Sequence, residues 1–118
     1  TRKCGSFNGK SFEQLEFEAP DLLQRLISEP DKKTPEDAES VSEFIIRVGK
    51  EIEAIVDKNE GNRIIIVTHP DVIKAAICDA LNIPHSSLQH IYIKTGSATQ
   101  ISYYESWKSL VYSDYTPL

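Results

Sequence analysis

The chain has 118 residues, of which 40% are hydrophobic and 26% charged, and its formal net charge is −5. This length predicts one domain, residues 1–118, with a single hydrophobic core. The acidic balance argues against nucleic acid and anionic membranes as partners, and no apolar run is long enough to span a membrane. Two cysteines are too few for a disulfide framework or a zinc site, and no cluster of ligands indicates a metal or other cofactor. We therefore expect a cytoplasmic protein without a cofactor.

The amino-terminal part predicts a loop followed by short helices. Gly5, Ser6 and Phe7 begin a loop bounded by two glycines, in which Phe7 is expected to contact the core. Apolar residues at helical spacing predict helices over residues 11–19 and 21–27. By themselves these segments carry no recognisable chemistry.

A long helix is predicted to begin near Ser40. Ser40 with Glu43 three residues later forms a capping box, whereas Thr34 followed by Pro35 is a weaker alternative start. Apolar residues then recur at helical spacing as far as Val56, before a glycine that suits a helix end. Such a helix is expected to cover one face of a sheet.

The next stretch predicts a strand, a histidine and a helix. Residues 63–68 contain four consecutive β-branched apolar residues, which is typical of a parallel strand buried on both faces. Pro70 suits the first turn of a helix that extends to Leu81. His69 should therefore lie at the carboxyl end of a core strand and beside a helix N-terminus, where anions bind in open α/β sheets.

The remainder predicts an antiparallel meander. Residues 88–94 alternate between apolar and polar and indicate a half-exposed strand, followed by a turn at 95–97 and strands at 98–104 and 108–112. His85 and His90 are interpreted as solvated surface residues. No earlier segment reads as the parallel neighbour that a strand at 63–68 would need, so the chain looks like the second half of an α/β sheet.

Four motifs occur in a recognisable order. They are a Gly-x-aromatic-x-Gly loop at Gly5–Gly9, Glu39-Ser40 with Arg47 behind it, the strand–His–helix stretch 65–75, and Gly-Ser-Ala-Thr at 96–99. In order and spacing they resemble the histidine phosphatase superfamily, also called the phosphoglycerate-mutase-like fold. Its second-histidine motif usually reads Val-Ser-His-Gly-x-x-Ile-Arg. The resemblance spans nearly the whole chain.

This resemblance implies a fold and a reaction. The fold would be α/β, the C-terminal part of a three-layer α/β/α sandwich whose mixed sheet ends in an antiparallel hairpin. The reaction would be phosphomonoester hydrolysis, or a mutase reaction, through a phosphohistidine intermediate on a small phosphorylated substrate. His69 matches the second histidine, which donates a hydrogen bond to the phosphoryl oxygens. Pro70 and Asp71 would contact substrate, and the loop with Gly5, Ser6 and Phe7 would lie near the site.

The chain also departs from the family pattern. It contains no Arg-His-Gly segment, which supplies the nucleophilic histidine, and Thr1 stands where the acid carboxylate is usual. Pro70 replaces the usual glycine and removes one backbone N–H. We interpret residues 1–118 as an incomplete domain, inactive alone, that lacks the first strand and the helices after it.

Two alternative functions remain open. One is a catalytically inactive remnant that binds phosphate or a protein partner and associates with itself through an exposed sheet edge. The other is a Rossmann-like binding module in which His69 is incidental, although the hairpin-rich C-terminus argues against it.

Overall fold

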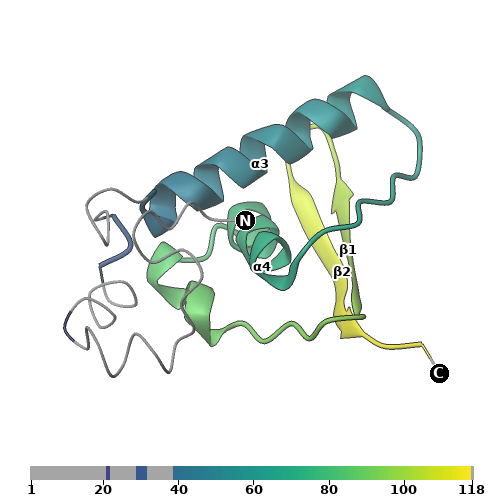
Figure 1. Cartoon of the computed structure of the whole chain (residues 1–118). Helices are drawn as coiled ribbons and strands as arrows, with labels where there is room; N and C mark the ends of the chain where they lie inside the picture. Colours follow the sequence, from purple (N-terminus) through teal and green to yellow (C-terminus); the bar gives the residue numbers. More distant parts are fainter. Residues whose placement is uncertain (1–20, 22–28, 32–38, 118) are drawn as a thin grey trace.

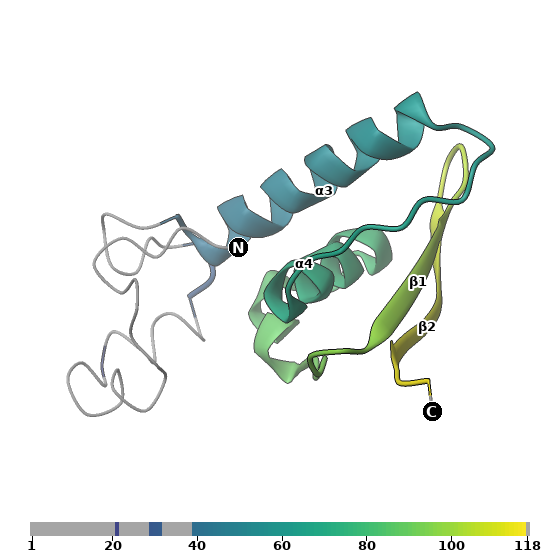
Figure 2. The same ribbon diagram turned by 45° about the vertical axis from the view of Figure 1, so that its right-hand side comes forward.

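The structure is a computed structural model that describes residues 21, 29–31 and 39–117. The loop expected at Gly5, Ser6 and Phe7, the helix at 11–19 and all but the first residue of the helix at 21–27 lie outside the described residues. Within residues 39–117 two α-helices, one 3-10 helix and two strands follow in chain order: α3 (Val41–Lys58), α4 (Pro70–Leu81), η2 (His85–His90), β1 (Ala98–Tyr103) and β2 (Lys108–Tyr115). The chain is thus α/β with a C-terminal antiparallel hairpin. In Figures 1 and 2, α4 lies between α3 and the hairpin and contacts both.

Helix α3 forms as its sequence predicts. The buried Ser40 caps it, because the Ser40 Oγ accepts a hydrogen bond from the Glu43 N–H at 3.0 Å. Four apolar side chains of the predicted stripe are buried in the core: Val41, Phe44, Ile45 and Val48. The predicted stripe extends along the helix beyond the core, since Ile55 near the far end of α3 is exposed.

Helix α4 is also confirmed. Pro70 occupies its first turn, and Asn82 ends it in the left-handed region with φ 57°. Its buried side is made of small residues and one isoleucine: Ala75, Ala76, Ile77 and Cys78. Burial of Cys78 raises the pKa of its thiol because the thiolate would lose its hydration.

The predicted strand at 63–68 is wrong for the part of the chain that the structure describes. These residues run back from α3 to α4 as an extended segment that joins no sheet (Figure 2). Ile65 and Val67 are 91% and 95% exposed, so the segment is not buried on both faces. A strand is defined by hydrogen bonds to a neighbour, and β propensity without that neighbour gives only extended backbone.

The predicted strand at 88–94 is wrong as well. Its first residues belong to η2, which begins after Pro84 with the Ser87 N–H donating to the Pro84 carbonyl at 2.9 Å. Leu88 is buried by this turn, and Ile93 in the extended segment that follows is buried too. The expected turn at 95–97 is present, with Gly96 at φ 81°, but it joins this segment to β1 without a paired strand before it.

The hairpin β1–β2 is the sheet of the described residues. Tyr103 lies opposite Lys108, and the connection is tight because the Tyr104 N–H donates to the Trp107 carbonyl at 2.8 Å. The rings of Tyr104 and Trp107 stack with their centroids 4.3 Å apart. Strand β2 extends to Tyr115, beyond the predicted end. The sheet has two antiparallel strands, so the mixed sheet expected from the sequence is not formed among the described residues.

A cluster of charged side chains joins the hairpin to both helices. The Lys108 Nζ on β2 hydrogen-bonds the Glu53 carboxylate on α3 and lies 3.2 Å from the Asp79 Oδ2 on α4. These two carboxylates raise the pKa of Lys108, whereas burial alone would lower it. The same Asp79 carboxylate sits against Gly49 of α3, where a Cβ would lie 2.4 Å from its Cγ. Gly49 therefore lets α3 and α4 approach closely.

This contact predicts the effect of Gly49→Ala. The new methyl group must displace the Asp79 carboxylate from Lys108, so we expect a loss of about 1–3 kcal/mol in the free energy of unfolding. Urea unfolding followed by circular dichroism measures it.

The control is the same substitution in an Asp79→Ala background. There the clash is absent, and alanine should be neutral or stabilising by up to about 1 kcal/mol, because it favours helix over glycine. An equal loss in both backgrounds would contradict the proposed contact.

Candidate functional site

His69 lies at the N-cap of α4, where the extended segment ends. Its backbone is extended (φ −107°, ψ 157°), and its carbonyl accepts the N–H groups of Val72 at 3.1 Å and Ile73 at 3.2 Å. The side chain is exposed and makes no capping hydrogen bond. The backbone of His69 is therefore held by the helix, while its imidazole faces solvent and can meet a ligand.

The two residues after His69 weaken the anion site expected of a helix N-terminus. Pro70 has no N–H, and the Asp71 Oδ1 accepts the Val72 N–H at 2.8 Å. Asp71 also places a negative charge in the first turn of α4, where it offsets the positive end of the helix dipole. The imidazole of His69 is thus an exposed side chain that this corner of the described chain offers to a ligand.

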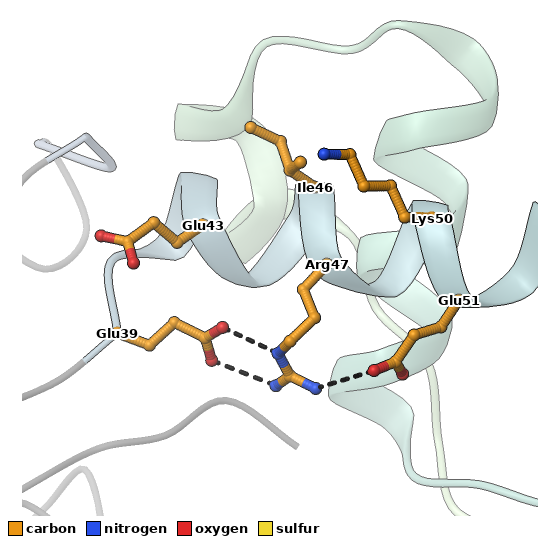
Figure 3. A pocket seen from close by; sticks show the side chains of 6 residues that line it. All are labelled: Glu39, Glu43, Ile46, Arg47, Lys50 and Glu51. Atoms are coloured by element: carbon orange, nitrogen blue, oxygen red, sulfur yellow. Dashed lines mark hydrogen bonds and ion pairs between the residues drawn. The ribbon is translucent and has the colours of Figure 1, made fainter.

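Glu39 and Arg47 form a two-pronged ion pair at the start of α3 (Figure 3). The Arg47 Nε lies 2.8 Å from the Glu39 Oε2 and the Nη2 lies 3.1 Å from the Oε1, whereas Glu51 is more distant at 3.8 Å. The hydrogen bonds that Arg47 donates to the Glu39 carboxylate are the main cause that raises the pKa of Arg47, and the charge of Asp71 adds to it.

A shallow pocket of about 450 Å³ surrounds Arg47 on the outer side of α3. Its lining has three carboxylates and two cations: Glu39, Glu43, Ile46, Arg47, Lys50 and Glu51. Because the excess charge is negative and Arg47 already binds Glu39, this pocket does not suit a phosphate. In the structure Glu39 and Arg47 pair with each other at the start of α3.

A hydrogen-bonded chain that sequence reasoning missed joins three separate segments. The Ser42 Oγ donates to the Asp31 Oδ1 at 2.7 Å, and the His85 Nδ1 lies 2.8 Å from the same Ser42 Oγ. Since the hydroxyl proton points to Asp31, the His85 Nδ1 acts as the donor. His85 is thus half-buried and bonded, contrary to the solvated surface role expected of it. Ser42 itself is 8% exposed, so it does not present a nucleophile.

The described residues hold no group of three or more His, Cys, Asp or Glu side chains placed to bind a metal ion. None of the described helices combines the length and apolar character needed to cross a membrane.

Comparison with known proteins decides the family. The sequence profile of the histidine phosphatase superfamily (branch 1) matches residues 2–114. The chain belongs to this superfamily. The resemblance seen in the sequence motifs is thereby confirmed, and the Rossmann-like alternative loses its support. A search of curated proteins found no match to the chain.

A solved structure shows the same fold. Bacillus stearothermophilus YhfR superposes with a TM-score of 0.85 at 21% sequence identity, over 98% of this chain and 58% of the YhfR chain. The chain therefore spans less than two thirds of the length of this relative. At this identity the likeness concerns the fold, and the roles of His69, Pro70 and Asp71 remain predictions.

The Glu39–Arg47 pair predicts a modest contribution to stability. The two side chains are partly buried and are joined by two hydrogen bonds. We therefore expect Glu39→Gln to lower the free energy of unfolding by about 1 kcal/mol.

The matched control is Glu51→Gln. Glu51 lies on the same arginine at 3.8 Å and is 65% exposed, so its loss should change stability by no more than about 0.5 kcal/mol. Urea unfolding midpoints of the two variants give the comparison, and equal losses would argue against the two-pronged pair.

Proposed function

We propose that this chain contributes the second active-site histidine, His69, to a histidine-phosphatase domain that hydrolyses small phosphomonoesters through a phosphohistidine. The nucleophilic histidine is not supplied by these residues. One observation supports the assignment above others: in a chain that belongs to this superfamily, His69 occupies the N-cap of α4 with its imidazole exposed and without a capping hydrogen bond.

The chemistry of the proposed role is electrostatic. As phosphoryl transfer proceeds, negative charge spreads over the equatorial oxygens of the phosphoryl group. A fixed imidazole N–H that donates to one of these oxygens stabilises that charge without reorganising at the moment of reaction. The two hydrogen bonds from α4 to the His69 carbonyl fix the backbone from which the ring projects.

We also propose that the complete fold is a three-layer α/β/α sandwich with a mixed sheet. In it, residues 63–68 would form an inner strand once a parallel neighbour pairs with them. Support comes from their β-branched sequence, their extended backbone, and the likeness to YhfR over 58% of its chain.

A second candidate function is phosphate binding without catalysis. It is favoured by two observations at the site itself. Pro70 removes a backbone N–H, and Asp71 adds a negative charge close to His69. Both features weaken the stabilisation of developing phosphoryl charge on which catalysis depends, and the 118 residues contain no Arg-His-Gly segment.

His69 is tested by phosphate binding. We expect inorganic phosphate to shift the imidazole resonances of His69 in NMR spectra, and His69→Ala to raise the apparent Kd at least about tenfold. The reason is that a hydrogen bond to a charged group is worth roughly 1.5–3 kcal/mol. His90→Ala is the matched control, because His90 is also exposed but lies on η2. Binding that survives His69→Ala would refute the assignment.

Turnover provides a separate test. We expect the 118-residue chain alone to release no phosphate from p-nitrophenyl phosphate, because no histidine in it matches the nucleophile. Steady hydrolysis that is lost in His69→Ala but kept in His90→Ala would show that the chain needs no second histidine from elsewhere, and would overturn that part of the proposal.

A further inference from the structure

The first turn of α4 already holds an anion, which is the carboxylate of Asp71. The first N–H groups of a helix have no partner within the helix, and this is why phosphate binds at helix N-termini. At the start of α4, Pro70 has no N–H, and the Ile73 N–H donates to the His69 carbonyl at 3.2 Å. The Val72 N–H donates to the Asp71 Oδ1 at 2.8 Å and is shared with the same carbonyl at 3.1 Å. The Asp71 carboxylate therefore occupies the place that a phosphate oxygen would take at the Val72 N–H.

This place is also within the normal range of the His69 side chain. The side chain of an N-cap residue ordinarily hydrogen-bonds the N–H of the second or third residue of its helix, and the third residue of α4 is Val72. His69 makes no such bond, and Asp71 holds that N–H instead. A phosphoryl group that accepts a hydrogen bond from the His69 ring would thus lie against the same turn.

Two effects favour the Asp71 carboxylate at this position. A hydrogen bond from an N–H group to a carboxylate is stronger than one to a neutral oxygen. A negative charge in the first turn of a helix is also stabilised by the helix dipole. A phosphoryl group would gain from the same N–H and the same dipole. The two anions therefore compete for one place.

From these contacts we propose that Asp71 is an internal competitor of the phosphoryl group at the His69 site. Its carboxylate leaves the Val72 N–H when a phosphoryl group binds beside His69, and it returns when phosphate departs. This inference rests on the proposed role of His69. Inorganic phosphate is the product of the proposed hydrolysis, so the returning carboxylate lowers the affinity for product and favours its release.

Phosphate titrations of the 118-residue chain, followed by NMR, test the competition. We expect Asp71→Ala to lower the apparent Kd for inorganic phosphate by about tenfold, because the competing charge-assisted hydrogen bond is gone. Asp71→Asn should lower the Kd by a smaller factor, since its amide oxygen can still accept the Val72 N–H without a full charge. A purely structural role of the carboxylate at the start of α4 predicts an unchanged or raised Kd.

An unchanged or raised Kd in Asp71→Ala therefore overturns the proposal. Equal effects of the two substitutions overturn the competition for the Val72 N–H. Asp71→Asn keeps the shape of the side chain, so it decides the question by the same criterion if Asp71→Ala does not fold.

Glu43→Gln is the matched control. Glu43 is the acidic residue in the first turn of α3, so this variant changes the net charge of −5 by the same amount as Asp71→Asn. It should leave the Kd for phosphate unchanged. If Glu43→Gln lowers the Kd as much as Asp71→Asn does, a general effect of charge replaces the competition.

His69→Ala, made alone and together with Asp71→Asn, separates this inference from the proposed function. If Asp71→Asn strengthens phosphate binding and His69→Ala has no effect, the proposed function fails while the competition stands. If His69→Ala weakens binding and Asp71→Asn does not strengthen it, the competition is overturned while the proposed function stands. Absence of phosphate binding in every variant overturns both.

Discussion

The close approach of α3 and α4 at Gly49 is the contact on which the described fold depends. Small residues line the buried side of α4, and the glycine on α3 leaves room for the Asp79 carboxylate. That carboxylate in turn binds Lys108, so the spacing of the helices and the attachment of the hairpin depend on one side chain. The negative charge of Asp79 is tolerable at this position because Lys108 pairs with it and because its side chain keeps some contact with solvent.

The same contact places His69. Because α4 is packed against α3 and its first turn hydrogen-bonds to the His69 carbonyl, the histidine backbone has one orientation relative to the core. The charge of Asp71 in that turn is felt by Arg47, which Glu39 fixes at the start of α3. The corner that holds His69 is therefore tied to α3 by the packing of α4.

Sequence reasoning succeeded where structure depends on neighbours along the chain. The cap at Ser40, the proline that begins α4 and the turn at 95–97 all act within a few residues. It failed where structure depends on a distant partner. Residues 63–68 have strong β propensity, but a strand needs a neighbour to bond with. At 88–94 the three-residue spacing of Leu88 and Ile91 suits a 3-10 turn, in which residues i and i+3 share a face, rather than the two-residue period of a strand. The link from Asp31 through Ser42 to His85 spans elements that no sequence motif connects.

Because Cys78 is buried, chemical labelling of its thiol can be used to follow opening of the helix interface. Cys78 is 1% exposed in the last turn of α4, and burial raises the pKa of its thiol. A thiol reagent can therefore reach its sulfur only when α4 separates from α3, so the rate of labelling at this one position reports how often the core opens. Because the same motion would release the His69 corner, that rate also measures how long the proposed site persists between openings.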